Sequence, residues 1–325
     1  VPKQEKPPKH VIQRYMSHAF ANDRFETQFP TFQDHAQRRI RSFCNPTASA
    51  YITAAPSDFV STLTDNETSW LWRERLGIIH EVVKILPKTC NCPNYPFIGN
   101  GHHLQICMKY KKKVHDPIRD ALRDACANAG VNSTTEQPGI INGTAEKPGD
   151  VVLHNPGEFY QGAKKLGGDI TSANHDIAVD VTVVDALSHH GRHSAAEMDK
   201  RAASPLHIIN IAEFNKRNAR PVGGGRTMEH RLASVNHKFW PMGFTSSGAS
   251  GPTFRTFLKN LSKTANVRRG KDEGWFYRYW TTKIAMTLHK RSAQAALWRS
   301  LDLKNHYDTS NNPYVEQETA THHSR

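Results

Sequence analysis

Hydrophobic residues recur along this chain at two different spacings, one typical of helices and one typical of strands. Residues 65–86 carry apolar side chains at helical spacing, after a capping signal at Asp65 or Asn66. The pattern places six of these apolar residues in a core: Trp70, Leu71, Ile78, Ile79, Val82 and Val83. Further helices are predicted at 117–130, 226–235, 253–265 and 275–303. The first of these has Asp116 as its predicted N-cap and Pro117 in its first turn.

Short runs of β-branched residues, bounded by turn-forming residues, predict the strands. They fall at 150–154, 176–187 and 237–245, and the second of them is the strongest. Residues 188–225 are polar and show no period, so they are predicted to be irregular. The chain is therefore expected to be an α/β protein.

Composition and charge narrow the class of partner. Of 325 residues, 43 are Lys or Arg and 30 are Asp or Glu, which gives a formal net charge of +13. No run of apolar residues reaches the roughly 18 that a membrane span needs. A globular chain this basic is typical of proteins that bind a polyanion, most often a nucleic acid, although a basic solvated surface would have the same composition.

Two clusters of basic residues are the candidates for nucleic-acid contact. The first lies beside Tyr110, and the second precedes a group of aromatic residues at 275–280. Their members are Lys109, Lys111, Lys112 and Lys113 in the first cluster, and Arg268, Arg269 and Lys271 in the second. The first cluster could equally be a solvated loop. Most of the aromatic residues are expected in the core, with one or two left to stack on bases.

Three of the five cysteines lie within 18 residues, which suggests a metal site rather than disulfides. The proposed zinc ligands are Cys90, Cys92, His102 and Cys107, with His103 as an alternative to His102 and His115 as a further candidate. Without a metal, the same cysteines would be reduced thiols lining a small core. Cys44 and Cys126 are predicted to be buried thiols.

Two aspartates stand at predicted strands, 30 residues apart. Asp150 precedes the strand at 151–153 and Asp180 lies inside the strand at 176–187. Two carboxylates on adjacent strands could hold a divalent cation such as Mg²⁺ near a phosphodiester. Asp150 could also simply cap a turn.

The order of these motifs resembles one region of known polyproteins. A Cys–His knuckle ends in GHHLQIC, then follow VHDPIRDALRDACANAG, KPGDVVL, HDIAVDVTVVDAL and FWPMGFTSSGASGP. This series, over roughly residues 70–300, resembles the C-terminal region of site-specific non-LTR retrotransposon polyproteins and their stand-alone relatives. There, a CCHC zinc knuckle precedes a restriction-like endonuclease of the PD-(D/E)xK type.

The resemblance implies a restriction-endonuclease-like mixed sheet with flanking helices, preceded by a helical segment and a small zinc knuckle. The implied divisions are a basic arm and helical segment at 1–88, the knuckle at 89–116, the endonuclease-like core at 117–252, basic C-terminal helices at 253–304 and a polar tail at 305–325.

The resemblance also assigns roles to single residues. Asp150 and Asp180 become the metal-binding acids, and His115 falls in the family's Arg-His-Asn/Asp signature, whose arginine is replaced by Val114. The catalytic lysine would fall near Thr227, with Met228 at the family's tyrosine, and neither residue matches. Lys216 is the nearest lysine, separated from the expected helix by a glycine-rich stretch, and Arg226 is another substitute. These departures imply that cleavage is weakened or lost.

The first functional expectation is therefore a basic RNA-binding structural component of a large ribonucleoprotein, with rRNA and other proteins as its partners. A mitochondrial ribosome is the specific expectation, since the sequence starts at Val1 rather than Met, as after removal of a presequence or in a fragment. The alternatives are an active Mg²⁺-dependent DNA endonuclease of a mobile element, which would be nuclear, and a zinc-stabilised DNA-binding module. A basic side chain within reach of both Asp150 and Asp180 would favour the enzyme. A filled acid site would favour the scaffold.

Overall fold

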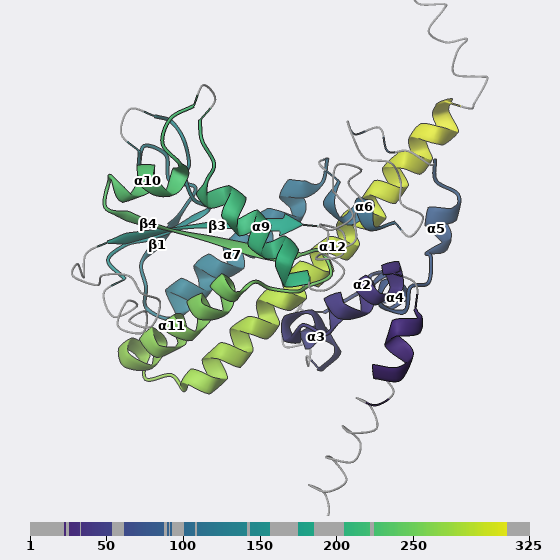
Figure 1. Cartoon of the computed structure of the whole chain (residues 1–325), viewed down its shortest axis with the longest axis horizontal. Coiled ribbons are helices and arrows are strands. Elements are labelled where there is room, and N and C mark those ends of the chain that lie inside the picture. The colour runs from purple at the N-terminus through teal and green to yellow at the C-terminus, as the bar shows by residue number, and fades with distance from the viewer. Residues whose placement is uncertain are drawn as a thin grey trace, which may run out of the picture.

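The structure is a computed structural model. It describes residues 23, 26–32, 34–53, 62–87, 90, 92, 101–107, 109–141, 144–156, 175–184, 205–221 and 224–310. In Figure 1, a sheet with its helices lies beside a group of short N-terminal helices, and the long helix α12 (Glu273–Ser310) runs past both.

Four strands form one mixed sheet in the order β1-β2-β3-β4. The strands are β1 (Ser133–Thr135), β2 (Val151–Leu153), β3 (Asp176–Val184) and β4 (His237–Thr245). β2 is antiparallel to both β1 and β3, whereas β3 and β4 are parallel over their whole length. The structure is thus an α/β protein with a mixed sheet, and three of its strands lie where the β-branched runs predict them.

Helices cover both faces of the sheet because its strands are apolar on both faces. Val151, Ile177 and Val179 pack in one cluster with α7 (Lys111–Asn128), α11 (Pro252–Arg269) and α12. The alternate residues Val152 and Ala178 pack with Leu232 of α10 (Met228–Ala233) on the opposite face. The helix α9 (Pro205–Arg217) also lies on that face, against β3 and β4.

A second core joins the N-terminal helices to α12. The described elements here are η1 (Phe29–Thr31), α2 (Asp34–Phe43), α3 (Pro46–Thr53), α4 (Asp65–Leu76), α5 (Glu81–Lys84) and α6 (His102–Ile106). Trp70 and Leu71 of α4 and Leu104 of α6 pack with apolar residues of α12, including Met286 and Ala293. One face of α12 therefore packs on the sheet side of the molecule, and another face packs against the N-terminal helices. None of the described helices combines the length and the apolarity that crossing a membrane requires.

Several predicted details at the N-terminal side need correction. The N-cap of α4 is Thr64, whose side chain forms a capping box with Glu67, rather than Asp65 or Asn66. Trp70, Leu71 and Val83 are buried as predicted and Val82 is half-buried, but Ile78 and Ile79 are 50% and 38% exposed. These two isoleucines follow the left-handed Gly77 that ends α4, so they are no longer on its apolar face. Cys126 is buried as predicted, whereas Cys44 is exposed.

Three helices also differ from the prediction. α7 begins at Lys111, six residues before Pro117, so Asp116 is not its N-cap and Pro117 lies inside the helix. Val114 and Ile118 are both buried against the sheet, and this packing outweighs the backbone hydrogen bond that a proline removes. α9 falls in the stretch predicted to be irregular. α12 continues to Ser310, into the predicted polar tail, while residues 1–22 and 311–325 lie outside the described residues.

Candidate active site and metal cluster

The two predicted metal-binding aspartates lie next to each other in the sheet. β2 and β3 pair Val151 with Val179, so the residue before β2, Asp150, faces Asp180. Asp150 is fixed by its backbone, because its N–H donates to the Val179 carbonyl at 2.7 Å and its Oδ2 accepts from the Val181 N–H at 2.6 Å. Gly149 permits this approach, since a Cβ there would lie 3.0 Å from the Val179 oxygen.

Lys216 brings a positive charge to this acid pair. It lies near the end of α9, and its Nζ is 2.8 Å from Oδ2 of Asp180. Burial raises the pKa of Asp180, the nearby ammonium of Lys216 lowers it, and the charge of Asp150 raises it again, with a net rise. Apart from this ion pair, Asp180 Oδ2 is buried and accepts no hydrogen bond from the described residues. In the structure, the Lys216 ammonium is therefore the positive group that balances the Asp180 carboxylate.

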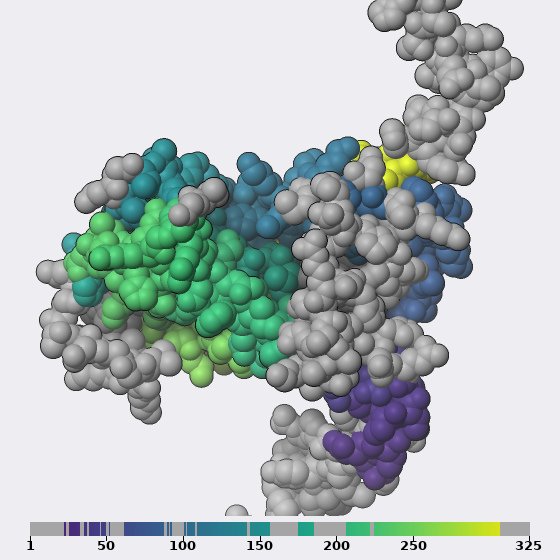
Figure 2. All heavy atoms as spheres, turned by 45° about the horizontal axis from the view of Figure 1, so that its top comes forward, coloured from purple at the N-terminus to yellow at the C-terminus, as the bar shows by residue number. Residues whose placement is uncertain are grey.

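Thr227, the position to which the resemblance assigned the lysine, has a different role. Its side chain caps α10 by accepting a hydrogen bond from the His230 N–H. The sequence separates Lys216 from that position by eleven residues, but α9 and α10 both lie on the face of the sheet where Asp180 emerges. Figure 2 shows this face, with the green segment that contains α9 and α10 at its surface.

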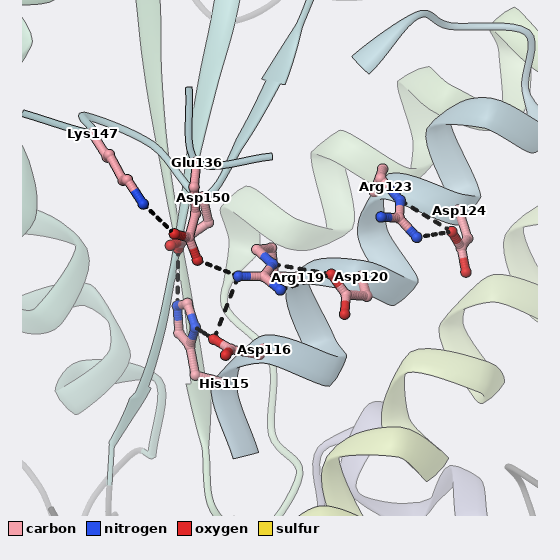
Figure 3. Close-up of polar contacts among 9 residues, drawn as sticks. All are labelled: His115, Asp116, Arg119, Asp120, Arg123, Asp124, Glu136, Lys147 and Asp150. Atoms are coloured by element: carbon pink, nitrogen blue, oxygen red, sulfur yellow. Dashed lines mark hydrogen bonds and ion pairs between the residues drawn. The ribbon is translucent and has the colours of Figure 1, made fainter. Parts of the chain in front are cut away.

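His115 joins the acid pair to α7. Its Nε2 lies 3.0 Å from Oδ2 of Asp150, and its Nδ1 lies 3.0 Å from Oδ1 of Asp116 (Figure 3). Burial alone would lower the pKa of this imidazole, but the bonds to Asp150 and Asp116 outweigh burial and raise the pKa to about 9. The raised pKa fits a protonated ring that donates to Asp116 from Nδ1 and to Asp150 from Nε2.

A network of charges holds α7 against the sheet beside this histidine. Arg119 contacts Asp116, Asp120 and Glu136, and Glu136 accepts from Lys147 Nζ at 2.7 Å (Figure 3). Because Lys147 lies in the segment that leads to Asp150, the network ties that segment to the helix that carries His115. Neither Arg119 nor Glu136 stands out in the sequence, since both are ordinary surface-type residues.

Glu213, which the sequence did not single out either, holds α9 in place. Its carboxylate accepts from the Gly243 N–H of β4 at 2.9 Å and from the Thr253 hydroxyl of α11 at 2.7 Å. A side chain at Gly243 would collide with Ile209 of α9. Burial raises the pKa of Glu213, while the two hydrogen bonds oppose the rise. Glu213 lies one helical turn before Lys216, so it determines where the ammonium is presented.

The second candidate site is the Cys–His cluster. One ligand atom each from Cys90, Cys92, His103 and Cys107 lies within 4.8 Å of the other three, so the cluster could hold a metal such as zinc. The sulfurs of Cys90 and Cys107 are 3.8 Å apart, and Cys92 Sγ is 3.2 Å from His103 Nε2. Three thiols and an imidazole are the donor set of structural zinc sites.

The fourth ligand corrects the sequence-based choice. His103, the alternative, has its ring beside the three sulfurs, while the side chain of His102 lies outside the described residues. His115, the further candidate, is committed to Asp150 and Asp116 instead.

Arg299 of α12 completes the surroundings of the cluster. It is 2% exposed, and its Nη2 donates to Cys90 Sγ at 3.0 Å. Its Nη1 lies 3.8 Å from Asp302, which also accepts from the Tyr110 hydroxyl at 2.7 Å. Burial alone would raise the pKa of the Cys90 thiol, but the hydrogen bond from this guanidinium contributes to a net lowering of that pKa. Its distance along the chain from the cysteines hides this role in the sequence.

The two predicted basic clusters lie at opposite ends of α7. Lys111 and Lys112 are exposed in its first turn, whereas Lys109 pairs with Asp302 and Lys113 lies over the Tyr110 and Trp298 rings. At the other end, Arg268 donates to the Gly130 carbonyl at 2.8 Å and Lys271 to Asn128 at 2.6 Å. An added Cβ on Gly130 would meet Arg269, so all three residues of the second cluster lie at this end. An 18-residue helix is about 27 Å long, so the two clusters are separate surfaces.

Comparisons with known proteins do not identify a family for this chain. No protein-family model matches the chain, and no curated protein matches it significantly. The functional inference therefore rests on the site geometry and on the resemblance in motif order.

Proposed function

We propose that this chain is a nucleic-acid-binding, Mg²⁺-dependent endonuclease, with a restriction-endonuclease-like core and Asp150, Asp180 and Lys216 as its catalytic residues. The observation that carries the proposal is the 2.8 Å contact between Lys216 and Asp180. The sequence argument for a lost activity rested on the missing lysine near Thr227, on Val114 in place of an arginine and on the glycine-rich stretch. The contact of Lys216 with Asp180 supports an active site in spite of the first of these departures. The expectation of a ribosomal RNA-binding component stays a prediction.

The chemistry follows from charges that surround one small site. A divalent cation bound by Asp150 and Asp180 would activate a water and stabilise charge on the departing oxygen. Lys216 is 41% exposed, so its ammonium can reach a phosphate while it remains near Asp180. There it would hold the attacking water and stabilise the extra negative charge of the transition state. His115 contributes a second positive charge, and its bond to Oδ2 holds the Asp150 carboxylate in its orientation.

The surrounding surface supports a polyanionic substrate. The chain carries a formal net charge of +13, and Lys111 and Lys112 are exposed in the first turn of the helix that also carries His115. The positive end of a helix dipole makes cations unfavourable in a first turn, and a bound phosphate relieves that repulsion.

The test is cleavage of a supercoiled plasmid and of labelled single- and double-stranded DNA and RNA, with Mg²⁺ or Mn²⁺. Asp180→Asn removes the metal-binding charge and is expected to abolish cleavage. Lys216→Met is expected to lower the rate by a factor of about 10²–10³, typical for loss of one group that stabilises a transition state.

The matched control is Asp176→Asn, because Asp176 lies on the same strand and the same face as Asp180 but pairs with His154. This variant should cleave like the wild type. Absence of cleavage by the wild type with either metal, on every one of these substrates, would overturn the proposal. Equal loss in Asp176→Asn and Asp180→Asn would also overturn it, since it would point to general damage to the strand.

A further inference from the structure

A pair of stacked aromatic rings lies on the surface at the start of α12, away from the acid pair. Trp275 is 48% exposed, and its ring stacks on Tyr279 at 5.1 Å between centroids and 14° between planes. Of the aromatic residues nearby, Phe276 and Trp280 are buried, and Tyr277 and Tyr279 are half-buried. An exposed tryptophan held in a stack is therefore a distinct feature of this surface.

The stack is held rigidly from beneath. Tyr279 meets the buried Trp280 edge-on at 5.3 Å, and Lys283 lies over the rings of both. Asp272 accepts the Trp275 N–H at 2.6 Å and so fixes the first turn of α12. Little conformational freedom of Tyr279 and Trp280 remains to be lost when a flat ligand adds to the outer side of Trp275.

The charge around the stack selects the class of that ligand. Residues 263–283 contain six basic residues and two acidic ones. The basic residues are Lys263, Arg268, Arg269, Lys271, Arg278 and Lys283. Of the two acids, Asp272 caps α12 and Glu273 lies in its first turn, where the helix dipole favours a negative charge. The surface thus offers a flat aromatic face within a positive field.

We propose that Trp275 and Tyr279 form a stacking platform for an unpaired base of a nucleic-acid strand, with Arg269 and Arg278 near its phosphates. Every base has a flat face for stacking, but a paired base is covered by its neighbours, so the platform takes single-stranded segments. This inference rests on the proposed nuclease function, and it identifies the substrate as a nucleic acid with an unpaired stretch. His115 and Asn128 are 13 residues apart on α7, so the platform end of that helix is about 20 Å from the acid pair.

The test is fluorescence anisotropy of a labelled 15-nucleotide single strand on the full chain, without added Mg²⁺. Trp275→Ala is expected to weaken binding about tenfold, while Trp275→Phe, which keeps a ring, restores part of it. Trp72→Ala is the matched control, since Trp72 is 42% exposed on α4, and it should bind like the wild type. A strand with abasic sites should bind the wild type more weakly than the normal strand does. Trp275→Ala should lower the affinity for this abasic strand only slightly further.

Three results would overturn the proposal. One is unchanged single-strand affinity in Trp275→Ala. Another is an equal loss for the single strand, the abasic strand and a blunt duplex, which would indicate charge alone. The third is that polyglutamate displaces the strand from the wild type but not from Trp275→Ala. That result would mean that the surface binds an acidic protein. Base-dependent binding without cleavage would refute only the nuclease, and cleavage without Trp275-dependent binding would refute only the platform.

Discussion

At the scale of single residues, the two candidate sites depend on side chains that come from distant parts of the sequence. Lys216 reaches Asp180 from a helix 36 residues further along, and Arg299 reaches Cys90 from more than 200 residues away. In both cases a positively charged side chain contacts an acceptor, a carboxylate or a sulfur, in a partly or fully buried place, where such a contact is strongest. Removing one partner leaves the other charge uncompensated, which makes each contact testable.

Arg299 is expected to strengthen metal binding at the Cys–His cluster. Replacing Arg299 with Leu removes the donor to Cys90, and residues in this position commonly contribute about 10–100-fold to metal affinity. Competition for Zn²⁺ with a coloured chelator measures the affinity directly. Arg291→Leu, which alters an arginine of the same helix that bonds Gln294, is the matched control. The role is refuted if both variants hold Zn²⁺ as tightly as the wild type.

At the scale of elements, α9 decides whether the candidate active site is complete. It lies on β3 and β4, and Glu213 joins it to Gly243 of β4 and to Thr253 of α11. The close approach of α9 to the sheet requires glycine at 243 and at 251, where a Cβ would collide with Ile209 or Glu213. A helix that is anchored in this way presents Lys216 at a fixed position.

Glu213→Ala is expected to destabilise the chain by about 1–3 kcal/mol, because it leaves a buried N–H and a hydroxyl without their acceptor. Glu213→Gln keeps an acceptor for the Gly243 N–H and removes a charge whose burial is unfavourable, so it should cost much less. The free energy of unfolding in urea distinguishes the two. Equal destabilisation by Glu213→Ala and Glu213→Gln would mean that the acceptor oxygen retained by Gln does not hold α9.

At the scale of the whole molecule, α12 connects the two cores. It packs on α7 and α11 on the sheet side and on α3, α4 and α6 on the other side. His289 lies in this helix, is fully buried, and donates from Nε2 to the Ala48 carbonyl of α3 at 3.1 Å. Burial, with the charge of Arg75, lowers the pKa of this histidine to about 4.

This histidine should make the chain less stable in mild acid. In the unfolded chain His289 binds a proton below its usual pKa of about 6.5, while the folded chain takes it up only near 4. Its contribution to stability is therefore complete above pH 6.5 and is lost as the pH falls toward 4, by about 3 kcal/mol in total.

Urea unfolding of the wild type and of His289→Gln at several pH values measures this loss. The acid sensitivity of the Cys–His cluster is common to both proteins, so it cancels in the difference between them. The two curves should converge as the pH falls from 6.5 to 4. Parallel curves would contradict the role of His289.

Elements whose residue pattern is local could be predicted from the sequence. The strands β3 and β4 and the helices α11 and α12 follow from their hydrophobic spacing, and Asp150, Asp180 and three cysteines follow from short motifs. Each of these depends on residues close together in the chain, so the sequence reports it directly.

Which side chains meet in the two sites depends on the packing of distant segments. The sequence offered Lys216 only as a substitute for a catalytic lysine expected near Thr227, and it predicted that α7 starts at Pro117. It missed α9, Glu213 and Arg299. The choice of His103 over His102 depends on how α6 packs against α12. Contacts between distant segments are fixed by packing over the whole fold, and no local spacing of residues records that packing.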